Sequence, residues 1–177
     1  MKVIACLGNP GKKYRRNRHN IGFIIAGLLS EIYNITLSEN KFSSVMGRGR
    51  IGVTDTLILL PQTYMNNSGT AVQKAMDFYK TGPGDLIVIH DEIELPFGEF
   101  RKKFGGGHKG QNGLRSIIQH TGTSDFHRLR FGVGRPENPN MSVADHVLSD
   151  FTSGELEKVT ELLPGVKDLL ESMISGS

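Results

Sequence analysis

The feature that most constrains the fold is an early apolar run that ends abruptly in turn residues. Val3–Leu7 is continuously apolar, and the segment Gly8-Asn9-Pro10-Gly11 follows at once. A short apolar run bounded by turn residues is typical of a strand buried on both faces. From Asn20 onward, apolar residues recur at the spacing of a helix, at Ile21, Ile24, Ile25, Leu28, Leu29 and Ile32. A buried strand followed by an amphipathic helix predicts an α/β fold.

The same alternation continues along the rest of the chain. Apolar and alternating segments predict further strands at residues 45–53, 56–60, 86–89, 100–104 and 129–133. Helices are predicted after Asn66-Asn67-Ser68, from about Asn112 to His120, and from Thr152, where Glu155 completes a capping box. Pro164 is expected to kink or split the last helix. No repeat or linker interrupts the pattern, so we expect a single domain over residues 1–177.

The net charge of +3 conceals an uneven distribution. Residues 11–20 hold five basic side chains and no acid, and residues 100–135 hold eight basic side chains against Asp125 alone. Residues 137–177 hold eight acids and two lysines, so a basic portion precedes an acidic carboxyl end. Basic charge clustered on one face indicates a phosphate-bearing partner. From charge alone, a solvated surface with local ion pairs is an equal alternative.

Composition excludes several other classes of protein. The one cysteine, Cys6, excludes an internal disulfide. The apolar start is shorter than the ~7–15 residues of a signal peptide core, and no run reaches the ~18 residues of a membrane span. We therefore expect a cytoplasmic protein without a membrane segment. Glycine makes up 22 of the 177 residues, above the usual ~7%, which indicates tight turns and close backbone approaches.

Two polar residues at element boundaries indicate acid–base chemistry. His19 lies where a loop enters a helix, and Asp91 follows the predicted strand at residues 86–89. Open α/β sheets bind ligands at the carboxyl ends of their strands. A histidine and an aspartate meeting there can form a general base with an orienting carboxylate. The alternative is an exposed histidine and a turn aspartate. Cys6 lies within an apolar strand and no serine stands in a G-x-S-x-G elbow, so water is the expected nucleophile.

Metal and dinucleotide sites are less favoured. His19, His90, Asp91 and His108 could converge on a metal, but the spacing of zinc ligands is missing, so we expect none. A metal-dependent hydrolase remains an alternative. Gly105, Gly107 and Gly110 match G-x-G-x-x-G, yet the strand before them is basic rather than apolar. We therefore expect no dinucleotide fold.

Asparagine recurs at the junctions between loops and elements, at Asn9, Asn20, Asn66, Asn67 and Asn112. An amide both donates and accepts hydrogen bonds, so it can hold a peptide backbone or a water molecule. Turn and helix-cap roles are the alternative for each of these residues.

Four segments resemble the bacterial peptidyl-tRNA hydrolase family, in the family's order and spacing. They are LGNPGKKYRRNRHNIGF (Leu7–Phe23), PQTYMNNSG (Pro61–Gly69), HDEIELPFGEFRKKFGGGHKGQNGLRSI (His90–Ile117) and FHRLRFGVGRP (Phe126–Pro136). The resemblance implies a mixed, twisted β-sheet surrounded by helices, acting as a monomer without metal or cofactor. It also implies an enzyme that hydrolyses the ester between a peptide and the 3′-terminal ribose of tRNA, which recycles tRNA from stalled or aborted translation.

The resemblance also implies roles for individual residues. His19 is the catalytic general base and Asp91 is its partner. The amides that line the cleft and hold the peptide, the water and the tRNA end are Asn9, Asn66 and Asn112. Tyr14 and Met65 form walls of the cleft, and the positions that contact tRNA phosphates are Lys103 and Arg130. The helix that opens at about Asn112 would be a lid.

The chain departs from the family at two positions. Cys6 stands where glycine is usual, and Gln111 stands where many members have a second histidine, directly before Asn112. Glutamine keeps hydrogen bonding but cannot titrate near neutral pH, which leaves a supporting role such as substrate gating open. An RNA-binding homologue without hydrolysis is the alternative function. The intact His19, Asp91 and three asparagines favour the enzyme.

Overall fold

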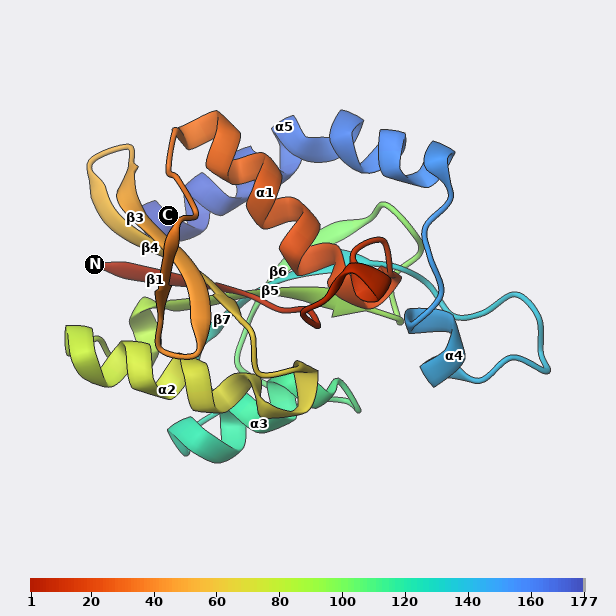
Figure 1. The fold of residues 1–177 in the computed structure, drawn as a ribbon, viewed down its shortest axis with the longest axis horizontal. Helices are drawn as coiled ribbons and strands as arrows, with labels where there is room; N and C mark the ends of the chain where they lie inside the picture. Colours follow the sequence, from red (N-terminus) through yellow and green to blue (C-terminus); the bar gives the residue numbers. More distant parts are fainter. Residues whose placement is uncertain (177) are drawn as a thin grey trace.

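A computed structural model describes residues 1–176, and its strands form one mixed sheet (Figure 1). The strand order is β2-β3-β4-β1-β5-β7-β6. β1 pairs in parallel with β4 and β5, β5 pairs in parallel with β7, and β2–β3, β3–β4 and β6–β7 are antiparallel. The strands are β1 (Lys2–Cys6), β2 (Glu39–Lys41), β3 (Ser44–Ile51), β4 (Thr54–Pro61), β5 (Leu86–Glu92), β6 (Phe100–Phe104) and β7 (His127–Gly132). This is the predicted α/β architecture.

Helices cover both faces of the sheet, which explains the unbroken apolar run of β1. α1 (Ile21–Tyr33) and α5 (Ser153–Ser175) lie on one face, and α2 (Ser68–Tyr79) and α3 (Asn112–Thr121) lie on the other (Figure 1). Ile4 packs with the first pair of helices, whereas Val3 packs with the second. Alternate side chains of one strand thus enter two separate cores.

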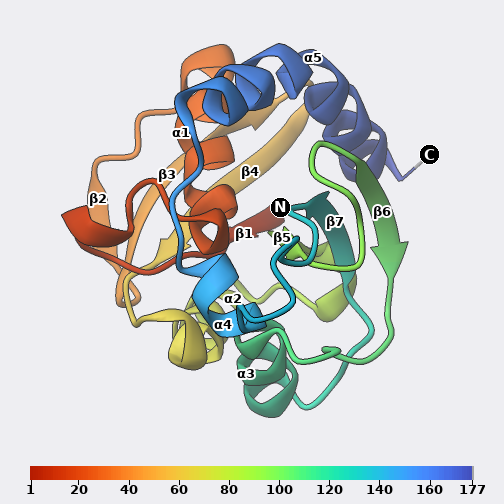
Figure 2. The ribbon, with the colours of Figure 1, turned by 90° about the vertical axis from the view of Figure 1, so that its right-hand side faces the viewer.

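The predicted elements are confirmed, but the short edge strand β2 was not predicted, and three further points differ. β5 extends to Glu92, so Asp91 lies within the strand rather than beyond its end. Of the two outcomes predicted at Pro164, a split is excluded, because α5 continues through it and buries Leu163 and Val166 on either side. A fifth helix, α4 (Val143–Val147), was not predicted, and it lies at the carboxyl-end edge of the sheet (Figure 2).

Close backbone approaches account for part of the excess glycine. A Cβ on Gly22 would lie 2.5 Å from the backbone of Leu7, so α1 crosses directly over the end of β1. A Cβ on Gly69 would lie 2.1 Å from the carbonyl oxygen of Ser116, so α2 and α3 touch. Since real Cβ atoms do not approach so closely, both crossings require glycine.

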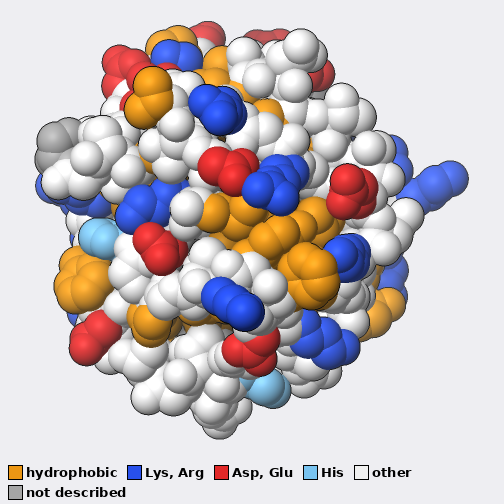
Figure 3. Space-filling view, turned by 90° about the vertical axis from the view of Figure 1, so that its left-hand side faces the viewer, with side chains coloured by type: hydrophobic (Ala, Val, Ile, Leu, Met, Phe, Trp, Pro, Cys, Tyr) orange, Lys and Arg blue, Asp and Glu red, His pale blue; other side chains and the backbone are white. Residues whose placement is uncertain are grey.

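The end of the molecule away from α4 gathers hydrophobic side chains with lysine and arginine among them (Figure 3). The rings of Phe42, Phe78 and Tyr79 pack tilted or edge-on against one another where β2 and β3 meet the end of α2. The Lys41 ammonium lies 3.8 Å from the Phe78 ring centroid. Across residues 1–176, the structure contains no helix that combines the length and the apolar character needed to cross a membrane.

Candidate active site

A cleft of about 290 Å³ opens at the carboxyl ends of β1 and β5. Parallel strands end at the same edge of a sheet, so loops from distant parts of the chain meet there. Six of the predicted site residues line the cleft: Asn9, His19, Met65, Asn66, Asp91 and Asn112. The fold therefore brings these predicted residues together around one cleft.

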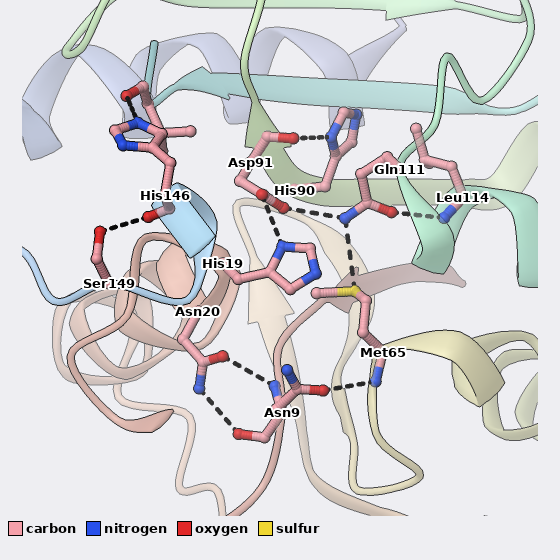
Figure 4. A network of polar contacts seen from close by, with 11 residues as sticks. Asn9, His19, Asn20, Met65, His90, Asp91, Gln111, Leu114, His146 and Ser149 are labelled. Carbon is pink, nitrogen blue, oxygen red and sulfur yellow. Dashed lines mark hydrogen bonds and ion pairs between the residues drawn. The ribbon is translucent and has the colours of Figure 1, made fainter. Parts of the chain in front are cut away.

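His19 and Asp91 form the contact that the sequence predicted. His19 belongs to a single 3-10 turn (Arg18–Asn20) that leads into α1, and its Nδ1 lies 2.7 Å from Oδ2 of Asp91 (Figure 4). Asp91 is 4% exposed, so its carboxylate is shielded from solvent. A carboxylate only accepts hydrogen bonds from a neutral imidazole, so Nδ1 carries the proton and Nε2 holds a free lone pair. In Figure 4 Nε2 points away from Asp91 toward Met65 and Asn9.

The pair shifts the pKa of both of its members. Burial by itself would lower the pKa of His19, but the charge and hydrogen bond of Asp91 outweigh it, and the pKa of His19 is raised. Burial by itself would raise the pKa of Asp91, but His19 and a hydrogen bond from Gln111 outweigh it, and the pKa of Asp91 is lowered. Asp91 is therefore ionised at neutral pH and makes His19 a stronger base.

Gln111 holds the second oxygen of Asp91. Its Nε2 donates to Asp91 Oδ1 at 2.9 Å, and its Oε1 accepts from the backbone N–H of Leu114 at 2.8 Å. The second bond makes Gln111 the N-cap of α3, a role that sequence reasoning had considered for Asn112. Both carboxylate oxygens of Asp91 are thus engaged, one by the base and one by the helix that borders the cleft.

Asn9 is held in one orientation by a pair of buried amides. Its Oδ1 accepts from the backbone N–H of Met65 at 2.7 Å, and its own backbone N–H and C=O bond the side chain of Asn20 at 2.9 Å each. Because only the amide oxygen can accept from Met65, Nδ2 is the end that faces His19 (Figure 4). Asn20 is 1% exposed and braces the loop, so it contacts no substrate.

Asn66 and Asn112 are exposed on the rim of the cleft. Within residues 1–176 neither amide has a hydrogen-bond partner, so both are available to a ligand. Tyr14 lies outside the cleft, where its ring packs edge-on against Tyr64 with centroids 6.4 Å apart. The structure brings Met65 into the cleft wall and leaves Tyr14 out of it.

The opposite wall of the cleft was missed by sequence reasoning. It is apolar and comes from α4 and the residue after it, and its members are Val143, Ala144, Val147 and Leu148. A sequence signal was present, since Ser142 caps this helix by accepting from the N–H of Asp145 at 3.0 Å, just ahead of two valines four residues apart. α4 has only five residues, which is why its periodicity was too short to detect.

The loop that carries His19 is tied to the segment after α4. Arg18 donates to Ser149 Oγ at 2.8 Å, to the Asp150 carbonyl at 2.7 Å, and to Glu155 at 2.8 Å. Backbone bonds join the same two segments, from Arg18 N to Ser149 O at 3.0 Å and from Phe151 N to Arg16 O at 2.8 Å. Arg18 therefore stabilises the fold around His19 and does not offer its charge to a partner.

Comparison with known proteins agrees with this geometry. A sequence model of the family described as peptidyl-tRNA hydrolase matches residues 3–177. The chain belongs to the peptidyl-tRNA hydrolase family. It is 47% identical to a peptidyl-tRNA hydrolase of Sorangium cellulosum, over 99% of this chain and 80% of that protein, and 43% identical to one of Bacillus subtilis, over 99% and 93%. The crystal structure of the Acinetobacter baumannii peptidyl-tRNA hydrolase superposes with a TM-score of 0.91 at 39% identity, covering 99% of this chain and 89% of that one.

Family membership makes the chain an enzyme that hydrolyses peptidyl-tRNA, and it does not favour the alternative of an RNA-binding protein without hydrolysis. The resemblance in the four sequence segments, the fold it implied and the reaction it implied are confirmed. The roles of individual residues remain predictions.

The two basic residues expected to contact tRNA phosphates lie outside the cleft, on neighbouring strands at one edge of the sheet. Lys103 is on β6 and Arg130 is on β7, where Arg130 faces Glu92 at 3.7 Å. Burial, followed by the charges of Lys109 and Arg130, lowers the pKa of Lys103. Like charges that crowd one another in this way attract a shared anion.

Another basic residue of the same region is internal. Arg128 is 2% exposed, and its guanidinium donates to the carbonyl oxygens of Gly106 and Gly107, the latter at 2.7 Å. The glycine-rich segment thus follows an edge strand and wraps a buried arginine. Such a loop does not cradle a dinucleotide, which agrees with the expectation from the sequence.

The four residues considered as metal ligands do not converge. His90 is buried and its Nδ1 donates to the carbonyl of Asp91 at 2.8 Å, while Nδ1 of His108 accepts from the N–H of Gly110 at 2.9 Å. Residues 1–176 contain no group of three or more His, Cys, Asp or Glu side chains arranged to hold a metal ion. Cys6 is fully buried, and burial raises the pKa of its thiol, so it cannot act as a nucleophile.

Proposed function

We propose that His19 is the general base of peptidyl-tRNA hydrolysis in this chain and that Asp91 positions it. The observation that supports this most directly is the 2.7 Å contact between His19 Nδ1 and the buried Asp91 carboxylate. It orients the imidazole, selects the tautomer with a basic Nε2, and stabilises the imidazolium that forms during the reaction.

The proposed reaction needs one water molecule and no covalent enzyme intermediate. His19 Nε2 removes a proton from water while the water oxygen bonds to the ester carbonyl carbon. The tetrahedral intermediate then expels the 3′ oxygen of the ribose, which takes the proton back from the imidazolium. General-base assistance of this kind contributes roughly 10²–10⁴-fold to the rate. An alkoxide of ribose leaves more readily than an amine, so a nucleophilic side chain is unnecessary.

Asn9 is the proposed donor to the developing oxyanion. Its Nδ2 faces His19, and its orientation is set by the bond from Met65 N–H rather than by the substrate. A donor fixed before the reaction begins loses no energy in reorienting, and such a donor contributes roughly 10²–10³-fold. Asn66 and Asn112 have free amides on the rim, where they would hold the peptide backbone, the water and the tRNA end.

Gln111 is proposed as a positioning residue. It holds Asp91 Oδ1 at 2.9 Å, which keeps Oδ2 directed at His19. Since the same side chain caps α3, the position of that helix and the orientation of the base are connected. α3 packs on α2 through the Gly69 crossing, and its movement as a lid remains a prediction.

The remaining contacts divide between the two parts of the substrate. The apolar α4 wall and Met65 would receive the peptide, whose backbone the asparagine amides bind, so preference for particular side chains would be weak. Lys103 and Arg130 would contact tRNA phosphates. We further propose that the protein acts as a monomer in the cytoplasm without a metal or other cofactor.

One experiment tests the main assignment. The protein is incubated with N-acetylaminoacyl-tRNA and with free aminoacyl-tRNA, each with and without a chelator. We expect cleavage of the blocked substrate only, unaffected by the chelator, and its loss in His19→Ala with tRNA binding retained. Turnover near the unmodified level in His19→Ala would refute the base assignment. Activity lost to the chelator would indicate a metal-dependent reaction instead.

A further inference from the structure

A second hollow adjoins the cleft on the far side of Asn9. It has a volume of about 350 Å³, and its lining includes Asn9, Lys12, Arg15, Asn20, Phe23 and Gln62. Asn9 borders both spaces, so the hollow begins one side chain away from the proposed oxyanion donor. A substrate chain that passes through the active site can therefore continue into this hollow.

The hollow lies beside a cluster of unpaired positive charge. Lys12, Lys13, Arg15 and Arg16 are all exposed, and within residues 1–176 none of them forms an ion pair. The nearby acids are already engaged, because Asp150 accepts from the side chain of Asn17 at 2.7 Å and Glu155 accepts from Arg18 at 2.8 Å. The positive charge of this loop is therefore available to an anionic ligand.

One aromatic side chain, that of Phe23, lines the hollow. Phe23 is half-buried, and one face of its ring lies directly on Gly8, where a Cβ would come within 2.7 Å of the ring. The rest of the ring borders the hollow together with Gln62, whose Nε2 donates to Leu60 O at 3.2 Å and whose Oε1 is left to accept. A fixed ring beside two cations and an amide matches the chemistry of a nucleotide, which has a flat base, a phosphate and polar base edges.

We propose that this hollow is a second RNA subsite. It takes one unpaired nucleotide of the tRNA 3′ end, with the phosphate between Lys12 and Arg15 and the base against Phe23. The proposal rests on the proposed function, since the ester must lie at His19 and the hollow adjoins that point. The loop that carries Lys12 and Arg15 lies on one side of the molecule in Figure 2, and β6, which carries Lys103, lies on the other. The tRNA end would thus be held from two sides of the active site.

The test uses two double variants with equal loss of charge. Lys12→Ser with Arg15→Ser removes the cations that line the hollow, and Lys13→Ser with Arg16→Ser removes their neighbours on the same exposed loop. The probes are deacylated tRNA with an intact 3′ end and the same tRNA trimmed of its unpaired 3′ nucleotides. Binding of deacylated tRNA requires no hydrolysis, so the result is independent of whether His19 is the base.

We expect the first double variant to bind intact tRNA about tenfold more weakly than the control double variant does. The two double variants should bind trimmed tRNA with equal affinity. With N-acetylaminoacyl-tRNA it should raise KM more than it lowers kcat. Phe23→Leu, which keeps an apolar side chain but removes the stacking face, should also weaken binding of the intact tRNA by about fivefold or more. Thermal unfolding midpoints verify that the variants fold.

Equal losses for intact and trimmed tRNA, or equal losses in the two double variants, would overturn the proposal in favour of general attraction to the tRNA body. Unchanged binding would show that RNA does not contact the hollow. A third outcome would also refute the proposal. If the first double variant binds deacylated tRNA normally but turns over only substrates with acidic peptides more slowly, the hollow is a peptide subsite.

Discussion

The two walls of the cleft differ in how firmly their side chains are held. On the polar wall, both oxygens of Asp91 are engaged, Gln111 bonds at both ends, and Asn9 is held through its side chain and its backbone. On the apolar wall, α4 is five residues long, only Val147 among its residues is buried, and Leu148 is 46% exposed. A proton transfer requires side chains held to within fractions of an ångström, whereas an apolar surface receives different peptides best when it can adjust. Substitutions on the polar wall should therefore lower kcat strongly, whereas substitutions on the apolar wall should have small effects.

The largest effect is expected at the base. His19→Ala should lower kcat by roughly 10²–10⁴-fold, because water must then attack without proton removal. Single-turnover hydrolysis of N-acetylaminoacyl-tRNA measures the chemical step, and a binding assay with deacylated tRNA serves as the control. A comparable loss of tRNA binding would show that His19 is needed for binding rather than chemistry.

The next effect is expected at Asp91. Asp91→Asn removes the charge that raises the pKa of His19 and leaves the burial that lowers it. The base must be neutral, so kcat/KM of the unmodified protein should fall as pH drops through the raised pKa of His19. In Asp91→Asn this acid limb should move to lower pH, and the plateau should drop by roughly 10²-fold or more because the imidazole is no longer held in its tautomer. A pH–rate profile from 5 to 9 checks both changes, and an unmoved limb would contradict the coupling.

Gln111 tests whether the polar wall acts as one unit. Gln111→Met keeps the length of the side chain but loses its hydrogen bonds, so kcat should fall about tenfold, the value of one hydrogen bond to a charged group. The lost helix cap should also lower the free energy of unfolding by about 1 kcal/mol.

A substitution that restores both bonds separates positioning from stability. In Gln111→His, one ring nitrogen can donate to Asp91 while the other accepts from Leu114 N–H, so most of kcat should return. A second histidine titration should then appear in the pH profile, because the new imidazole also contacts Asp91. A purely structural role would be indicated if Gln111→Met lost stability but kept kcat and its pH profile.

Residues outside both walls should affect binding without affecting chemistry. Lys103→Ala and Arg130→Ala should each raise KM several-fold and reduce the slope of log affinity against log salt by about 1, as expected for one lost phosphate contact. Affinity for deacylated tRNA measured between low and moderate salt gives the slope. Unchanged slopes in both variants would exclude the proposed phosphate contacts.

The smallest effect is expected on the apolar wall. Leu148→Ser should raise KM by about two- to fivefold for substrates with large apolar peptides and change kcat little, because a half-exposed side chain contributes only part of its transfer free energy. Comparing acetylglycyl-tRNA with a substrate that carries a longer apolar peptide provides an internal control. A loss of kcat as large as that of Gln111→Met would show that this wall is as firmly coupled to the base as the polar one.

Sequence patterns predicted best those features that depend on residues within a single helix, strand or motif. The apolar run of β1, the helical spacing of α1 and the capping box of α5 each reflect burial or bonding within a few residues, and each was predicted. The four family segments identified His19 and Asp91 as partners. Arg18 and Arg128 were counted as surface charge because a sequence does not show that a guanidinium bonds a distant carbonyl or carboxylate.

The sequence by itself determined the alternation of strands and helices, the edge of the sheet where the site lies, and the family of the enzyme. The tertiary structure decided which atoms meet. It joined His19 to Asp91 across 72 residues, gave Gln111 two partners, added α4 as the second wall, and left four cations unpaired beside a hollow. Periodicity records which face of an element is buried, whereas a hydrogen bond between distant segments depends on how those elements dock and which rotamers the docking allows.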